Sequence, residues 1–214
     1  MAKESELQRM MLVFFEDELG YKIRQPHLVS RELLIRDDVI SFMRSSANKK
    51  AYDKTLRQFS GDIARMEVAF CDALAVYLFQ DNFKRDDNKI NVAIRLKEPS
   101  FKFEGEEFLL WHRSGSLIND RFQENTFAVV EEVIYKPEEN GPSRRVDLAM
   151  FINGIFFSYA ELKHLSQNQS AKVEGRKKVI ANYAEAVDYF SVKKSEEDDL
   201  HKLAMFERAI HVIS

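Results

Sequence analysis

The chain has 214 residues, of which 45% are hydrophobic and 31% are charged, and its formal net charge is −3 at neutral pH. This apolar content excludes a disordered protein and is enough to build the core of one large domain. The slightly acidic balance excludes nucleic-acid binding through overall charge, so any polyanion site must be a local basic patch.

The spacing of apolar residues predicts three helices in the first part of the chain. The first covers residues 4–19. The second follows Ser30, a capping residue, and runs to about residue 43. The third is a long helix over residues 52–79, and Gly61 is the place where it could break.

Short β-type runs follow, separated by Gly, Pro, Asn and Asp. Two helices are expected after them, at 171–190 and 196–208, and the chain ends in a strand-like run at 208–214. Because that run resembles a strand entering a core, we expect the sequence to be a fragment of a longer chain. The predicted strands are INVAIRL (90–96), EFLLWHR (107–113), NTFAVVEEVIY (125–135), RVDLAMFI (145–152) and IFFSYAEL (155–162).

These elements predict an α/β fold, a mixed central sheet flanked by helices, with a helical N-terminal part at 1–85 packed on a core at 86–214 as one compact domain. The glycines form no phosphate loop and no dinucleotide fingerprint, so no nucleotide motor is encoded here. The single cysteine, Cys71, is predicted to be a small apolar residue of a helix rather than a nucleophile. With no signal segment and no membrane-spanning run, the protein is expected to be cytoplasmic.

The stretch RRVDLAMFINGIFFSYAELKH, residues 144–164, carries the candidate chemistry. Two apolar runs meet at an Asn-Gly pair. Asp147 lies near the start of the first run, and Glu161 and Lys163 lie at the end of the second. Residues two apart in a strand share a face, so Glu161 and Lys163 are expected to point the same way.

Two registers of this hairpin are possible. A two-residue loop pairs Ile152 with Ile155 and separates Asp147 from Glu161 on opposite faces. A three-residue loop pairs Phe151 with Ile155 and puts Asp147 diagonal to Glu161, about 7–8 Å away. Only the second register lets the two acids share one cation.

Two converging carboxylates suit a hard divalent ion such as Mg²⁺. Such an ion acidifies a bound water and neutralises charge on phosphoryl oxygens. Lys163 could orient that water or stabilise the pentavalent phosphorus. Asp147, Glu161 and Lys163 together therefore predict phosphodiester hydrolysis, whereas the alternative is that all three are ordinary solvated residues at strand ends.

The same stretch closely resembles the nuclease signature of the R (restriction and translocation) subunits of type I restriction-modification enzymes. An Arg-rich lead-in, an Asp, FxNGxP and xELK follow one another there at this spacing. The resemblance implies a restriction-endonuclease-like fold and the PD-(D/E)xK motif, with Asp147 and Glu161 as metal-binding acids and Lys163 as the catalytic lysine. More weakly, it extends to ENTFAVVEEVIYK and to the order of a helical part followed by a sheet.

Two departures from the family pattern matter. Val146 replaces a Pro, and Val179 replaces the Gln that precedes Tyr183 by four residues, with Gln169 or Asn182 as weak substitutes. In this superfamily a Glu of the first helix often assists the metal. Three candidates compete for that position and none is assigned, namely Glu6, Glu16 and Glu18.

Basic residues after the motif are candidates for DNA contact, because KVEGRKK carries four basic residues against one acid. A second basic group lies in the helical part and is a weaker candidate. The predicted DNA-binding residues are Lys172, Arg176, Lys177, Lys178 and Tyr183. The second group is Lys49, Lys50, Lys54 and Arg57.

The resemblance therefore implies Mg²⁺-dependent cleavage of double-stranded DNA by the nuclease domain of a type I restriction enzyme R subunit. It also implies an ATP-driven motor elsewhere in the full polypeptide, and modification and specificity subunits as partners. The main alternative is a non-catalytic nuclease-like module for DNA binding or subunit assembly, which Val179 and the acidic net charge favour. A stand-alone nuclease with the same motif is a third possibility.

Overall fold

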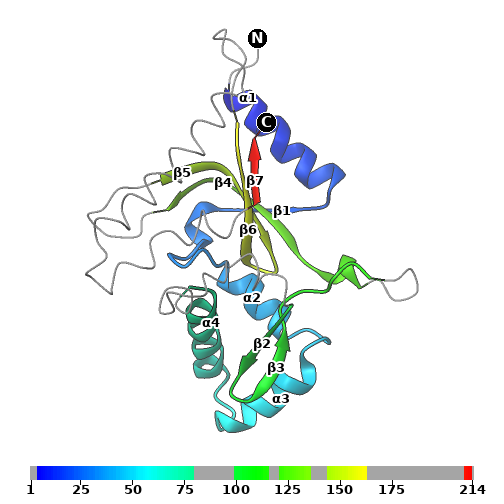
Figure 1. Cartoon of the computed structure of the whole chain (residues 1–214), viewed down its shortest axis with the longest axis vertical. Helices are drawn as coiled ribbons and strands as arrows, with labels where there is room; N and C mark the ends of the chain where they lie inside the picture. The colour runs from blue at the N-terminus through cyan, green and yellow to red at the C-terminus, as the bar shows by residue number, and fades with distance from the viewer. Residues whose placement is uncertain (1–3, 80–98, 116–120, 136–143, 163–209, 214) are drawn as a thin grey trace, which may run out of the picture.

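The computed structural model describes residues 4–79, 99–115, 121–135, 144–162 and 210–213 (Figure 1). A five-stranded sheet forms the centre, in the order β1-β4-β5-β6-β7. β1 is parallel to β4 and β7 is parallel to β6, whereas β4, β5 and β6 are antiparallel neighbours. The predicted α/β fold with a mixed central sheet is confirmed. The strands are β1 (Lys22–Arg24), β4 (Phe127–Tyr135), β5 (Arg144–Ile152), β6 (Ile155–Glu161) and β7 (Ile210–Ile213).

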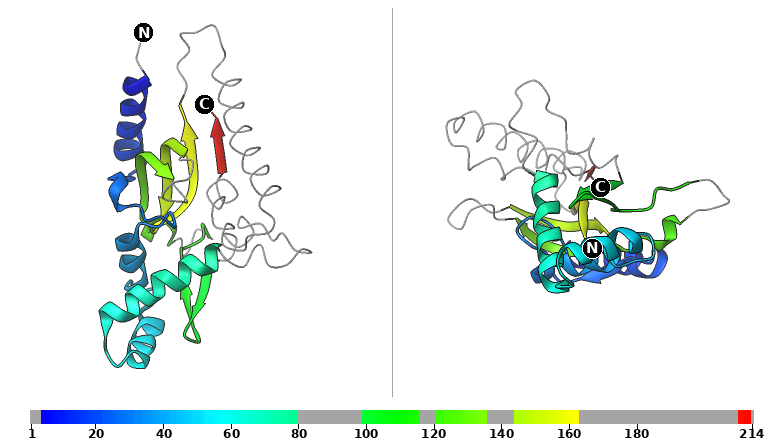
Figure 2. Two further views of the ribbon diagram at one scale, coloured as in Figure 1. Left: turned by 90° about the vertical axis from the view of Figure 1, so that its left-hand side faces the viewer. Right: turned by 90° about the horizontal axis from the view of Figure 1, so that it is seen from below.

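The N-terminal helix lies along one face of the sheet (Figure 2). Helix α1 (Glu4–Val13) continues into η1 (Phe14–Glu18), a short π-helical turn, and the chain then turns at Gly20, where φ is +68°. The predicted helix over residues 4–19 is thus confirmed. Its apolar side chains share one buried cluster with β5 and β6: Leu7, Met11, Leu12 and Phe15 pack with Leu148, Met150, Ala160 and Leu162.

The opposite face of the sheet is covered in part by the segment before α2. Leu33 and Ile35 are buried there in one cluster with Val130, Ala149 and Phe156. The sheet therefore has apolar side chains packed against both faces, which explains why its strands are apolar almost throughout.

The second helix, α2, covers Arg36–Met43 and so begins later than predicted. The hydroxyl of Ser30 accepts a hydrogen bond from the N–H of Leu34, so the serine closes a turn instead of capping a helix. Leu34 then forms a β-bridge with Ile155 at the start of β6. The backbone ahead of α2 is thereby used to hold the hairpin.

The predicted long helix is two helices, α3 (Lys49–Gln58) and α4 (Ile63–Phe79). The break falls at Ser60 and Gly61, whose φ angles of 55° and 82° no α-helix can contain, so the expected break near Gly61 is confirmed. Beside these helices lies a two-stranded sheet of β2 (Ser100–Phe103) and β3 (Glu106–Leu109). An aromatic cluster joins α4 to this sheet: Phe70 contacts Phe101, Phe103 and Phe108.

The predicted strands match the structure best in the central sheet. β4, β5 and β6 confirm the runs at 125–135, 145–152 and 155–162, and β7 lies within the final run. β3 occupies only the start of the run at 107–113, since residues 110–115 have no regular structure. β1 and β2 were not predicted, because each is short and carries a lysine, which is typical of loops.

Other predictions fall outside the described residues: the strand at 90–96, the helices at 171–190 and 196–208, and the boundary at residue 85. α1 and β1, which belong to the predicted helical part, pack on and pair with the central sheet. In the ranges that the structure describes, no helix has the length and apolarity needed to cross a membrane.

The tip of the β5–β6 hairpin connects the central sheet to other parts of the fold. The side chain of Asn153 accepts a hydrogen bond from Thr126 N–H (2.7 Å) and donates to the carbonyl of Leu110 (2.9 Å). The carbonyl of Gly154 accepts the N–H of Ile35 (2.8 Å), just before α2. The Asn-Gly pair is thus both a turn and a docking point.

A substitution at this tip should be costly. Gly154 and Gly105 both have φ of +79°, but a Cβ at Gly154 would lie 2.3 Å from the carbonyl oxygen of Ile35, whereas a Cβ at Gly105 would meet nothing within 4 Å. We expect Gly105→Ala to cost about 1–2 kcal/mol from backbone strain. Gly154→Ala should cost about 1–3 kcal/mol more, because the backbone must also shift. Urea unfolding of both variants measures the difference, and equal losses would contradict the proposed docking.

Cys71 should be unreactive in the folded chain. Its side chain is 1% exposed in the core around α4, and burial raises the pKa of its thiol to about 11. At pH 8 only about one thiol in a thousand would then be ionised. We expect a thiol-specific reagent to label the native chain slowly and the urea-unfolded chain rapidly. Equally fast labelling of both would contradict this burial.

Candidate functional site

The β5–β6 register differs from both predicted registers. Ile152 pairs with Ile155, so the Asn-Gly turn has two residues and the predicted three-residue loop is wrong. Beyond Phe151↔Phe156, however, Met150 pairs with Ser158, so β6 contains one additional residue, Phe157. This β-bulge shifts all later pairs by one position.

The bulge leaves the two predicted metal-binding acids at the next positions beyond the last pair of the ladder. The last pair before them is Leu148↔Ala160, so the next positions along the two strands are those of Asp147 and Glu161. Residues directly opposite in an antiparallel pair share a face, with Cβ atoms about 4.5–5.5 Å apart. A regular two-residue hairpin would place Asp147 and Glu161 on opposite faces of the sheet. The bulge shifts the register by one residue and removes that separation.

Asp147 is held by a contact from the end of β6. Asp147 is buried, with 9% of its surface exposed. Its Oδ2 accepts a hydrogen bond of 2.6 Å from the backbone N–H of Leu162. Leu162 itself is 1% exposed and packs in the cluster beneath α1. Because Leu162 lies between Glu161 and Lys163 in the chain, this contact ties the first predicted acid to the segment that carries the other two residues.

The main chain of Asp147 is held from α1. Gln8 donates a hydrogen bond from Nε2 to the carbonyl oxygen of Asp147, over 3.2 Å. The β4–β5 ladder pairs residues on both sides of Asp147 but skips its own pairing with Glu132, where φ is +51°. Sequence reasoning missed Gln8. The available signal was its position as a polar residue between apolar neighbours that face the sheet.

The other predicted site residues are less fully described. For Glu161 the structure gives the backbone alone, and Lys163 and the predicted DNA-binding residues from Lys172 to Tyr183 lie outside the described ranges. Among side chains that the structure does describe, no three His, Cys, Asp or Glu groups converge as a metal site. The first-helix candidates Glu6, Glu16 and Glu18 are exposed, and their role stays unassigned.

The second basic group on α3 is partly neutralised. Lys54 forms an ion pair of 2.9 Å with Glu106 of β3, and Lys49 lies 3.6 Å from Asp53. These acids reduce the positive charge that the group could offer to a phosphate backbone.

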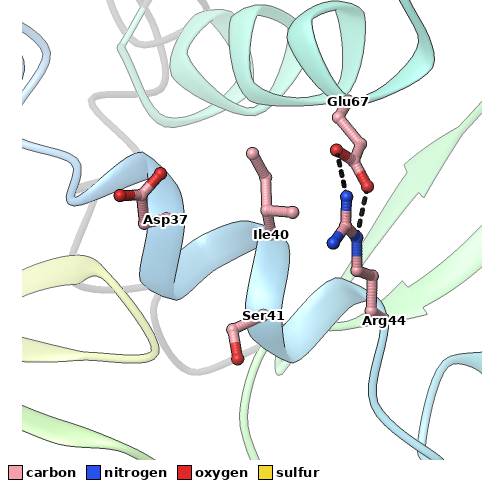
Figure 3. Close-up of a pocket in the computed structure, with 5 residues that line it drawn as sticks. All are labelled: Asp37, Ile40, Ser41, Arg44 and Glu67. Carbon is pink, nitrogen blue, oxygen red and sulfur yellow. Dashed lines mark hydrogen bonds and ion pairs between the residues drawn. The ribbon is translucent and has the colours of Figure 1, made fainter. Parts of the chain in front are cut away.

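A pocket of about 420 Å³ lies between α2 and α4 (Figure 3). Its most buried charged residue, Glu67, accepts two hydrogen bonds from Arg44, of 2.6 and 2.7 Å, and a third from the hydroxyl of Tyr52. The hydrogen bond with Glu67 is the main cause that raises the pKa of Arg44. Since Asp37 is a second acid in the lining and the arginine is neutralised, this pocket suits neither DNA nor a phosphate.

The comparison with protein families agrees with the resemblance in residues 144–164. The family described as the type I restriction enzyme R protein N terminus matches residues 1–214, which is the whole chain. No match was found among curated proteins or among solved structures. On the strength of a match over its full length, the chain belongs to the family of type I restriction enzyme R protein N-termini.

Proposed function

We propose that this chain is a Mg²⁺-dependent nuclease domain that cleaves double-stranded DNA within a type I restriction enzyme. The observation that carries the proposal is the bulged register, in which Asp147 and Glu161 are the next positions after the pair Leu148↔Ala160, together with the hydrogen bond from the Leu162 N–H to the Asp147 carboxylate. Membership of the R protein family supports the substrate class.

The donor chemistry fits a magnesium ion. Asp147 presents a carboxylate that a backbone N–H holds in place, and Glu161 supplies a second carboxylate from the next position on β6. Oxygen ligands of this kind are those that Mg²⁺ prefers. When bound, the ion would neutralise charge on the phosphoryl oxygens and make a water more acidic.

The remaining steps fall to side chains of this chain. Lys163 follows Glu161 by two residues, and its ammonium group would orient the attacking water or stabilise the pentavalent phosphorus. Lys172, Arg176, Lys177, Lys178 and Tyr183 would contact the DNA backbone.

The wider assembly follows from the family. We infer that modification and specificity subunits select the DNA site, and that an ATP-driven motor elsewhere in the full polypeptide delivers DNA to this domain in the cytoplasm. A non-catalytic module for DNA binding or subunit assembly is the second candidate. The valine at position 179, in place of the family Gln, favours it.

Two substitutions distinguish these candidates. Asp147→Asn keeps an oxygen that can accept the Leu162 N–H but removes the charge, and Lys163→Ala removes the amine. In the full-length subunit assembled with its partners, each should slow DNA cleavage by about 100-fold or more. ATP hydrolysis and translocation should be unchanged.

A matched control is Asp72→Asn, since Asp72 is an exposed acid of α4 that pairs with Arg36. Its cleavage rate should equal that of the unmodified enzyme. If Asp147→Asn and Lys163→Ala also cleave at that rate, the domain is the non-catalytic module instead.

A further inference from the structure

Gln8 is a polar residue on the face of α1 that packs against the sheet. Its neighbours on that face are Met11, Leu12 and Phe15, which are three, four and seven residues further along and which belong to the cluster with Leu148. A helix that packs on a sheet normally uses apolar residues at such positions. The amide therefore needs a partner inside the contact.

That partner is the carbonyl oxygen of Asp147, 139 residues away in the chain. The contact falls where the β4–β5 ladder omits the pair of Glu132 with Asp147, between Glu131↔Leu148 and Val133↔Val146. A partly buried carbonyl that lies beside a gap in a ladder needs another donor. Gln8 is the donor that the structure provides, at 3.2 Å.

The N-terminal helical segment, α1 with η1, is linked to Asp147 by two routes. Gln8 holds the main-chain carbonyl directly. Phe15 packs in the same cluster as Leu162, whose N–H holds the carboxylate. We propose that Gln8 is a positioning residue for the cleavage reaction, which fixes the backbone of Asp147 so that its carboxylate meets the metal and Glu161. This proposal rests on the proposed nuclease function.

A neutral amide suits this role better than a carboxylate. An ionised glutamate has no proton to donate to a carbonyl oxygen. In the structure the amide of Gln8 uses Nε2 to act on the backbone of Asp147. This distinguishes Gln8 from the exposed Glu6, Glu16 and Glu18 of the same helical segment.

The chain offers a matched control for the test. Gln58 of α3 also donates its side-chain amide to a backbone carbonyl, that of Glu104, over the same 3.2 Å. Methionine keeps the length and helix propensity of glutamine but has no N–H. Gln8→Met and Gln58→Met thus remove the same kind of hydrogen bond at two places, only one of which touches Asp147.

Both variants, Asp147→Asn and the unmodified protein are compared as the full-length subunit assembled with its partners. DNA cleavage is measured over a range of Mg²⁺ concentrations. We expect Gln8→Met to slow cleavage by about 10-fold or more and to raise the Mg²⁺ concentration for half-maximal rate, as supporting contacts of metal ligands do. Gln58→Met should stay within about twofold of the unmodified protein, because its hydrogen bond is remote from the site.

A second measurement does not depend on activity. Hydrogen exchange of the peptide that covers residues 144–162 should become faster in Gln8→Met and stay unchanged in Gln58→Met. Suppose that Asp147→Asn abolishes cleavage while Gln8→Met matches Gln58→Met in both measurements. The positioning role proposed for Gln8 is then refuted, and the nuclease function stands. If Asp147→Asn cleaves normally, the nuclease function fails and the positioning role fails with it.

Discussion

One additional residue in β6 determines which positions of β5 and β6 pair next to the candidate site. Side chains alternate between the faces of a strand, so a shift of one position moves every later side chain to the other face. Phe157 provides that shift between the Asn-Gly turn and the end of β6. Without it, Asp147 would face Ala160, and the position of Glu161 would lie on the far side of the sheet. The catalytic proposal therefore depends on a local irregularity of the hairpin.

The hairpin sequence thus combines two kinds of constraint. Asn153 and Gly154 at the tip bond to the segments around Leu110, Thr126 and Ile35, and their role is structural. Asp147 and Glu161 lie at the opposite end, and the role proposed for them is chemical. One short motif therefore contains both the residues that attach the hairpin to the rest of the fold and the two acids at its other end.

The sequence predicted those parts of the fold that depend on local patterns. The helix over residues 4–19, the break near Gly61 and the three long strands of the central sheet all follow from periodicity and turn residues. The predicted start of the second helix was wrong. Ser30 closes a turn with Leu34, and Leu34 forms a β-bridge with Ile155, which is far away in the chain. Such tertiary competition leaves no periodic signal.

The same distinction holds at the site. The candidate acids were chosen from residue type and spacing, whereas the sequence left a two-residue and a three-residue turn both open, and the structure has the two-residue turn. The bulge was not predictable, since Phe156 and Phe157 are both apolar and either could face the core. Gln8 was missed because its partner is a carbonyl oxygen, which every residue has, so the identity of Asp147 gives no indication of the contact.

β1 has a consequence for how the chain can be divided. These three residues, Lys22–Arg24, lie parallel to β4 and cover its outer edge. A shortened protein that began after them would expose the backbone N–H and C=O groups of β4 to other molecules, and open edges of that kind promote aggregation. The segment that ends with β1 is therefore not a removable appendage, and a shortened form of this chain should retain it.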